Sequence, residues 1–327
     1  NNSKLLTTLD NKSNYIMHYR NLKQALQSGL ELKKIHKVIE FDQSDWLRQY
    51  INLNAEKRKA ASNEFEKNFF KLMVNAVFGK TMENVRKIME FKLVSNKEKF
   101  NKLIKKNTFV DRIIYGENIV GMHFDKTKIV LDRAIYVGMC ILDLSKVHIY
   151  NFHYNVMKPL LCSNIELCYM DTDSFIYLLK CKDAEKYLQQ IAAHLDTSNY
   201  CSTNKLYSLA NQGVLGKFKD EVKGRKITRF VGLRAKIYAI EVDGENEIKR
   251  LKGITKAVLN KDISFDDYVT CLNGGKTTYS ENHVIKSVKH NVYTVCINKK
   301  TLDIQDDKRV ILPDGIHTVP HGYKRLN

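Results

Sequence analysis

The sequence feature that most constrains the fold is the stretch Tyr-Met-Asp-Thr-Asp-Ser-Phe at residues 169–175. Asp171 and Asp173 lie one residue apart between two β-prone runs, so the stretch predicts a hairpin with two carboxylates at its tip. Mg²⁺ takes carboxylate oxygens and keeps several waters, so one or two aspartates together with substrate phosphates can hold it. The alternative is a turn in which aspartate supplies only local hydrogen bonds.

The charge of the chain favours a polyanionic partner. It contains 54 Lys and Arg against 36 Asp and Glu, which gives a net charge of +18 spread along 327 residues. Nucleic acid is the commonest partner for a positive field of this size. An anionic membrane is the rival, but the sequence has no apolar run of about 18 residues. We therefore expect a nucleic-acid partner and no membrane.

The cysteines and the first residue bear on the cellular setting. Seven widely spaced cysteines without a Cys-x-x-Cys pair indicate neither a disulfide framework nor a zinc site. A reducing, intracellular compartment fits this pattern best. Because the chain starts at Asn1 and lacks a signal-peptide pattern, we expect a fragment or a processed product.

A helix over residues 63–79 is the strongest helical prediction. Asn63 and Glu66 have capping-box spacing, and an apolar stripe at helical period predicts the buried face: Phe65, Phe69, Leu72, Met73, Ala76 and Val77. Gly79 is expected to end the helix. On the opposite side, Lys71, Asn75 and Phe78 fall within roughly 60° of one another. Either they form a functional face, or they are a solvated face that happens to include a ring.

The other predicted elements are simpler. The β-branched content of residues 32–41 favours a strand over a helix, and Ser44 is expected to cap a short helix. Periodicity and turn signals predict further elements: helices over 19–26, 132–157 and 183–195, a hairpin over 109–123, a basic strand over 227–240, and a capping box at Ser264 and Asp267.

Three features in this order resemble the family B DNA polymerases. They are the helix with Lys71, Asn75, Phe78 and Gly79, the acidic hairpin, and a strand with Lys236 and Tyr238. The family motifs read Lys-x-x-x-Asn-x-x-Tyr-Gly, Tyr-x-Asp-Thr-Asp-Ser and Lys-x-Tyr. Residues 78–84, 216–221 and 306–309 look most like the protein-primed branch carried by large DNA transposons and related viruses. The resemblance covers most of the chain, least securely its first 50 residues.

The resemblance implies an α+β fold, part of a polymerase right hand with fingers helices, an antiparallel palm sheet and a thumb. Residues 1–100 would form the fingers and an adjoining palm segment, 101–257 the palm with the acidic hairpin, and 258–327 the thumb. The implied activity is DNA-templated DNA synthesis, in which two Mg²⁺ or Mn²⁺ ions assist nucleotidyl transfer from a dNTP to a primer 3′-OH. The implied partners are primer–template DNA, a dNTP and a terminal priming protein, in the nucleus or wherever the element replicates.

The resemblance also implies roles for single residues. Asp173 would be a metal ligand with Asp171 beside it in support, and Lys71 would meet the triphosphate as a point charge. Asn75 would hydrogen-bond near the nucleotide, and Phe78, in place of the usual tyrosine, would still stack against the nascent pair beside Gly79.

Further cations would hold the DNA. Lys236 and Tyr238 would grip the primer strand near its end. Lys217, Arg234 and Lys252 would contact phosphates, which positions a duplex without reading its sequence. A solvated strand face is the alternative for these last three cations.

Two departures from the family pattern limit the expected activity. The upstream metal-binding motif Asp-x-x-Ser-Leu-Tyr-Pro is missing, because none of the three prolines has that setting. No 3′–5′ exonuclease is credible either, since Asp243-Gly244-Glu245 is better explained as a turn. We therefore expect a carboxyl-terminal polymerase fragment that alone extends primers very slowly or not at all.

Two other classes of protein are alternatives. One is a catalytically inactive transposon remnant that only binds nucleic acid. The other is a reverse transcriptase or RNA polymerase, which also uses paired aspartates. The Phe78-Gly79 pair and the Lys236/Tyr238 pair argue against the second class.

Overall fold

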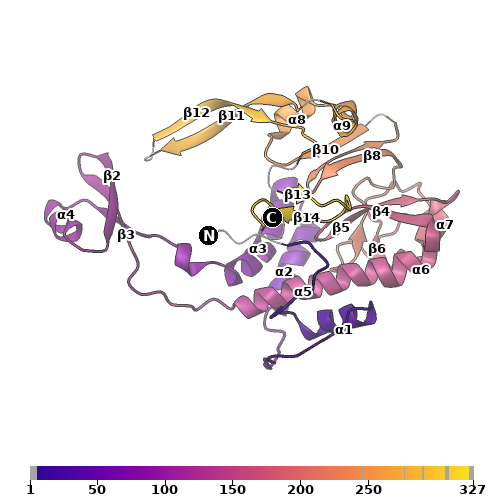
Figure 1. The fold of residues 1–327 in the computed structure, drawn as a ribbon, viewed down its shortest axis with the longest axis horizontal. Helices are drawn as coiled ribbons and strands as arrows, with labels where there is room; N and C mark the ends of the chain where they lie inside the picture. Colours follow the sequence, from indigo (N-terminus) through magenta and orange to yellow (C-terminus); the bar gives the residue numbers. More distant parts are fainter. Residues whose placement is uncertain (1–5, 245, 276, 289–290, 306–308, 324–327) are drawn as a thin grey trace. The chain divides into compact units, whose positions relative to one another are not determined.

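The computed structural model describes residues 6–244, 246–275, 277–288, 291–305 and 309–323 (Figure 1). These residues form a mixed α+β chain with several small, mostly antiparallel sheets, as the sequence predicted. They divide into two compact units, described here separately: residues 1–16, 149–283 and 296–327 form the first, and residues 17–148 and 284–295 the second. Residues 306–308, which belong to a stretch used for the resemblance, lie outside the described part.

The acidic hairpin of the first unit consists of β4 (Ile165–Asp171) and β5 (Ser174–Leu179). One face of β5, with Phe175, Tyr177 and Leu179, packs on a cluster around buried Leu161. Ile176, on the other face, packs on a second cluster that includes Val242. The hairpin therefore has apolar contacts on both faces, which explains the continuous apolar run in β5.

A three-stranded sheet lies next in the first unit, in the order β10-β9-β8. Its strands are β8 (Ile227–Arg234), β9 (Ile237–Val242) and β10 (Asn246–Leu251). The single basic strand predicted over 227–240 is wrong, because the chain reverses at Ala235 and Lys236. The positive φ of 64° at Lys236 makes this tight reversal.

Two helices cover this sheet: α8 (Lys256–Asp262) and α9 (Phe265–Leu272). The capping box predicted at Ser264 and Asp267 is confirmed, with the Ser264 side chain accepting from the Asp267 amide. Fully buried Tyr268 and Leu302 belong to one core with Leu251 and Leu259. This core contains residues from both sides of position 258, where the thumb was predicted to begin; the three-part division itself stays a prediction.

The remaining elements of the first unit are short or peripheral: α6 (Lys158–Leu161), α7 (Ala184–Gln190), the parallel pair β6 (Leu195–Asp196) and β7 (Phe218–Lys219), the long hairpin β11 (Tyr279–Val288) and β12 (Asn291–Lys300), and β13 (Arg309–Ile311) with β14 (Thr318–Pro320). Residues 284–295 of the long hairpin are grouped with the second unit.

Three helices begin the second unit: α1 (Tyr19–Gln27), α2 (Arg48–Ala60) and α3 (Glu64–Thr81). Asn63 caps α3 as predicted, accepting from the Glu66 amide. The predicted buried stripe is only partly right, since Phe65, Phe69, Leu72 and Ala76 are exposed. Met73 and Val77 of that stripe are partly buried, and Tyr50 of α2 donates to the carbonyl of Met73.

Other local predictions in the second unit are also corrected. Residues 32–41 form neither the predicted strand nor a helix and are exposed, because β-branched residues without a partner strand have no ladder to join. Ser44 does not cap a helix, since α2 starts at Arg48 after Leu47. The helix α3 continues past Gly79 to Thr81.

A small sheet module follows α3. Its strands are β1 (Glu90–Val94), β2 (Phe109–Gly116) and β3 (Ile119–Phe124), in the order β1-β3-β2, with α4 (Lys97–Ile104) on one face. The predicted hairpin at 109–123 is therefore confirmed as β2 and β3. The core of the module contains Val94, Leu103, Met122 and Phe124.

The long helix predicted over 132–157 is observed as α5 (Ile135–Asn151), which continues as a π-helical turn at Phe152–Met157. The helical segment continues past residue 157 into α6, which contains Pro159 and ends at Leu161, so the predicted end at 157 is too early. The two units divide within α5, between His148 and Ile149.

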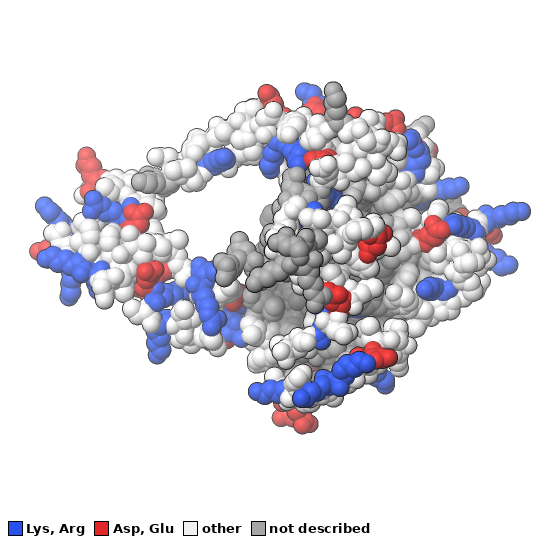
Figure 2. Space-filling view, viewed as in Figure 1, with Lys and Arg blue, Asp and Glu red and all other residues white. Residues whose placement is uncertain are grey.

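Basic side chains are spread over the visible surface rather than gathered in one patch (Figure 2). Within the described residues, no helix combines the length and apolarity needed to span a bilayer.

Candidate functional site

The tip of the acidic hairpin is a two-residue turn between Asp171 and Ser174. The Asp173 amide donates to the Asp171 carbonyl at 2.6 Å, and the Thr172 hydroxyl donates to the Asp171 carboxylate at 3.0 Å. Thr172 has a φ of 54°, a rare conformation for a β-branched residue that costs on the order of 1–3 kcal/mol and concentrates at functional sites. The turn leaves Asp173 exposed.

Lys236 joins this tip to the sheet of β8, β9 and β10. Its Nζ lies 2.8 Å from Asp171 Oδ2, and its backbone amide donates to the Tyr169 hydroxyl at 2.8 Å. The hydrogen bond from Lys236 lowers the pKa of Asp171, and the same contact raises the pKa of Lys236. Two motifs separated by more than sixty residues in sequence therefore meet in one site.

Tyr238 supports this contact from β9. Its ring centroid lies 4.6 Å from that of Tyr169 and 6.4 Å from that of Phe230. Burial raises the pKa of Tyr238. The ring therefore packs against the first residue of the acidic motif and helps to fix the hairpin on the sheet.

The three other predicted DNA-binding cations differ in their surroundings. Lys217 Nζ donates to the Ala193 carbonyl at 2.6 Å. Arg234 donates to the backbone carbonyls of Gln305 at 2.6 Å and Asp303 at 3.2 Å. Lys252 is exposed and close enough to Asp171 to help lower its pKa. Of these three cations, Lys252 is the one with a described electrostatic link to the acidic tip; the phosphate contacts remain predictions.

The predicted nucleotide-binding residues lie on α3, in the second unit. Lys71 and Asn75 are exposed, whereas Phe78 is half-buried. A side chain at Gly79 would meet only open space, so packing does not require glycine there. The approach of this face to the acidic hairpin of the first unit stays a prediction.

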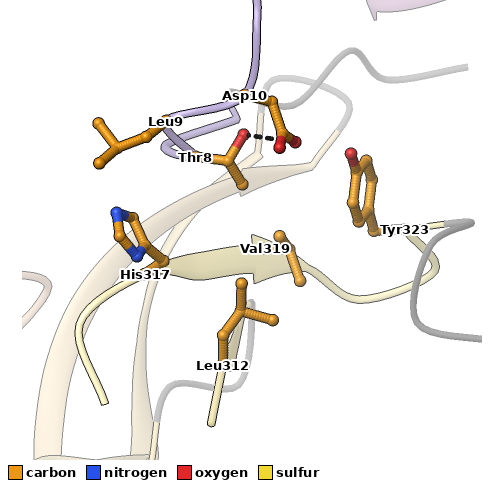
Figure 3. A pocket seen from close by; sticks show the side chains of 7 residues that line it. All are labelled: Thr8, Leu9, Asp10, Leu312, His317, Val319 and Tyr323. Atoms are coloured by element: carbon orange, nitrogen blue, oxygen red, sulfur yellow. Dashed lines mark hydrogen bonds between the residues drawn. The ribbon is translucent and has the colours of Figure 1, made fainter. Parts of the chain in front are cut away.

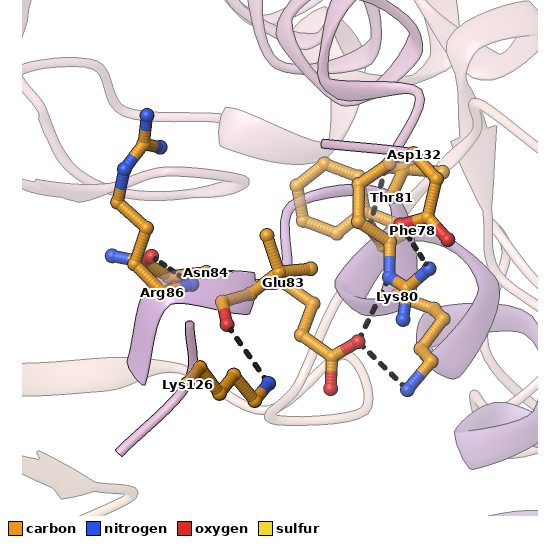
Figure 4. A network of polar contacts seen from close by, with 10 residues as sticks. Phe78, Lys80, Thr81, Glu83, Asn84, Arg86, Lys126 and Asp132 are labelled. Carbon is orange, nitrogen blue, oxygen red and sulfur yellow. Dashed lines mark hydrogen bonds and ion pairs between the residues drawn. The ribbon is translucent and has the colours of Figure 1, made fainter. Parts of the chain in front are cut away.

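An ion-pair network fixes the chain just after α3 (Figure 4). The Glu83 carboxylate pairs with Lys80 at 2.8 Å and with Arg133 at 2.9 Å, and these contacts lower its pKa. Gly138 of α5 lies so close to Met82 that an added Cβ would be 2.3 Å from the Met82 sulfur. Together these contacts hold the end of α3 against the start of α5.

A shallow pocket of about 450 Å³ lies elsewhere in the first unit (Figure 3). Residues 8–10 and the segments around β13 and β14 line it: Thr8, Leu9, Asp10, Leu312, His317, Val319 and Tyr323. Thr7 bonds to Thr318 beside it. None of the predicted site residues lines this pocket.

The residues at the tip fit part of a divalent-metal site. Asp173 offers an exposed carboxylate and Asp171 a second one, which matches the one or two carboxylates that Mg²⁺ uses with substrate phosphates. Within the described part of the chain, no three His, Cys, Asp or Glu side chains cluster as metal ligands. Asp171 is already paired with Lys236, so Asp173 is the better candidate for a direct ligand.

Sequence reasoning missed three structural contributors to these regions. The Tyr169 hydroxyl binds the Lys236 amide, and its signal was the tyrosine that opens the acidic motif. The Glu83–Arg133 pair and the close approach at Gly138 had no local signal, because each joins segments about fifty residues apart.

Comparisons of the chain with protein-family models, curated proteins and solved structures find no match.

Proposed function

We propose that this chain is part of a DNA-templated DNA polymerase of the family B type, in which the acidic hairpin carries one share of a two-metal centre. The observation that carries the proposal is the direct contact between two predicted motifs. Lys236 pairs with Asp171 at 2.8 Å while Tyr238 packs on Tyr169. This adjacency is what a polymerase palm requires, since the primer end must lie beside the metal ligands.

Each residue then has a distinct part in the proposed site. Asp173 would ligate Mg²⁺ or Mn²⁺, and the metal ions would supply charge stabilisation at the attacking and leaving oxygens. Lys236 holds Asp171 in its ionised form, and with Tyr238 it would present the adjoining sheet to the primer. Lys71 and Asn75 would bind the dNTP from α3; this assignment rests on the sequence resemblance.

Iron-mediated cleavage tests the proposed metal site without requiring catalysis. Fe²⁺ can replace Mg²⁺ at such sites; added hydrogen peroxide oxidises it to Fe³⁺ and yields hydroxide and a hydroxyl radical that cuts the nearby backbone, while added ascorbate reduces the iron again. We expect cuts at residues 171–174 that excess Mg²⁺ suppresses and that Asp173→Asn removes. Glu185→Gln, which changes an exposed carboxylate on α7, is the matched control and should leave the cuts unchanged. Cuts distributed equally in all three proteins would contradict the assignment.

A further inference from the structure

The sheet module of the second unit has one face that its helix leaves open. The core residues Val94, Met122 and Phe124 point to the side of α4. Because side chains alternate along a strand, Phe91, Leu93 and Tyr115 belong to the other side. Phe91 and Tyr115 each keep 40% of their surface exposed, and Leu93 keeps 64%. This side of the sheet is called the open face below.

A glycine organises the two rings on the open face. Gly121, at the centre of β3, pairs with Leu93 on one side and Ile113 on the other. A Cβ added to Gly121 would lie 2.3 Å from the Phe91 ring and 2.7 Å from the Tyr115 ring. The two rings therefore converge over the strand from opposite neighbours, which requires glycine at this position.

The charge around the module suits an anionic ligand. Residues 85–128 contain eleven Lys and Arg against five Asp and Glu, and basic side chains are visible over this module in Figure 2. Lys106 and Lys126 lie close enough to Glu90 to help lower its pKa. Glu90 pairs with Phe124 on the α4 side of β1, so these two cations lie across the sheet from the rings and the positive charge belongs to the module as a whole. Asp111 also lies on the open face, opposite His123.

We infer that the open face is a stacking platform for unpaired bases of single-stranded nucleic acid. Exposed rings on a small sheet and a net positive charge on the surrounding module are the two features that bind single strands, through base stacking and backbone attraction. Duplex DNA keeps its bases stacked inside, so it can use only the cations. This site is separate from the acidic hairpin and does not depend on the proposed polymerase function.

The test compares the affinity of the full chain for a fluorescent oligothymidylate and for a duplex. Phe91→Leu and Tyr115→Leu keep an apolar side chain and remove the ring. We expect each to weaken single-strand binding by about fivefold to a hundredfold, because stacking dominates the affinity for each bound base. Duplex affinity should change less than twofold.

Two controls keep the result specific. Phe65→Leu removes an exposed ring from α3 and should leave both affinities unchanged. Phe91→Leu and Tyr115→Leu should keep the iron-mediated cuts at residues 171–174, which separates this inference from the proposed metal site. Circular dichroism and the melting temperature of each variant establish that the module still folds.

Photo-cross-linking gives an independent readout on the unaltered protein. An oligonucleotide that carries 5-iodouracil should cross-link to the peptides that contain Phe91 or Tyr115. The inference is wrong if those peptides carry no cross-link or if single-strand affinity survives the loss of both rings. The protein that carries both Phe91→Leu and Tyr115→Leu gives one more contrary outcome. If it binds single strands normally but is a monomer where the unaltered protein is a dimer, the open face contacts a second copy and the inference is wrong.

Discussion

Replacing Tyr169 by phenylalanine removes one hydroxyl from the contact that joins the acidic hairpin to its neighbouring sheet. The hydroxyl accepts a hydrogen bond from the Lys236 amide at 2.8 Å, whereas the ring packs at a tilt against Tyr238, with centroids 4.6 Å apart, and stays in the variant. A neutral hydrogen bond stabilises a fold by about 0.5–1.5 kcal/mol. Because the exposed turn lets the freed amide bind water, we expect a loss of about 0.5–1 kcal/mol.

Amide hydrogen exchange measures this loss at the site itself. The Lys236 amide should exchange about two- to fivefold faster in Tyr169→Phe, while the buried Ala239 amide on β9 keeps its protection. Tyr169→Ala should lose a further 0.5–1.5 kcal/mol or so, because the contact between the two rings is lost as well. Tyr207→Phe, on a surface loop, is the matched control. An unchanged exchange rate at Lys236 in Tyr169→Phe would refute this description of the contact.

Three further predictions follow from the described contacts. The pKa of the paired Asp171 carboxylate is lowered, so the pair stabilises the fold above the unfolded pKa near 3.8, and this stability is lost as the pH falls through the folded pKa. NMR titration should show a higher pKa of Asp171 in Lys236→Met than in the unaltered protein, and an unchanged pKa would contradict the pairing. Leu302→Ala should cost about 2–5 kcal/mol in denaturant unfolding, because Leu302 is fully buried in the core under α8 and α9; a loss below about 1 kcal/mol would show that the site collapses or is not core. Gly138→Val should lower the melting temperature, and Met82→Ala should restore part of it, since the added atoms meet the Met82 side chain; equal effects in both backgrounds would exclude that clash.

Local signals predicted the elements that depend on neighbouring residues. The acidic hairpin, the hairpin at 109–124 and the Ser264 capping box are encoded by turn residues, alternation and cap spacing within about ten residues. The cap of α3 at Asn63 belongs to the same group.

Features that depend on distant partners were not predictable in this way. The apolar stripe of α3 gave only part of the buried face, because the partner of this helix is α2 and not a central core. Residues 32–41 have strand-like composition but no pairing partner. The reversal at Lys236 was hidden in a β-prone run, since the turn residues Ala235 and Lys236 are neither glycine nor asparagine.

The candidate site shows the same limit. The residues Asp171, Asp173, Lys236 and Tyr238 were identified from motif order, but their contacts were not. The packing of the hairpin on β9 determines that Lys236 pairs with Asp171 Oδ2. It also determines that the Tyr169 hydroxyl accepts a hydrogen bond from the Lys236 amide. Lys217 and Arg234 donate hydrogen bonds to backbone carbonyls, and the spacing of residues in the sequence could not indicate these partners.

Templated primer extension by the polypeptide of the whole reading frame that encodes this chain tests the central claim most directly. The account predicts incorporation of the nucleotide that the template specifies in the presence of Mg²⁺. It also predicts a loss of at least about two orders of magnitude in Asp173→Ala and none in the control Glu185→Gln. Extension by Asp173→Ala at the unaltered rate, or no templated extension by an intact reading frame, would contradict the account and favour a nucleic-acid-binding remnant.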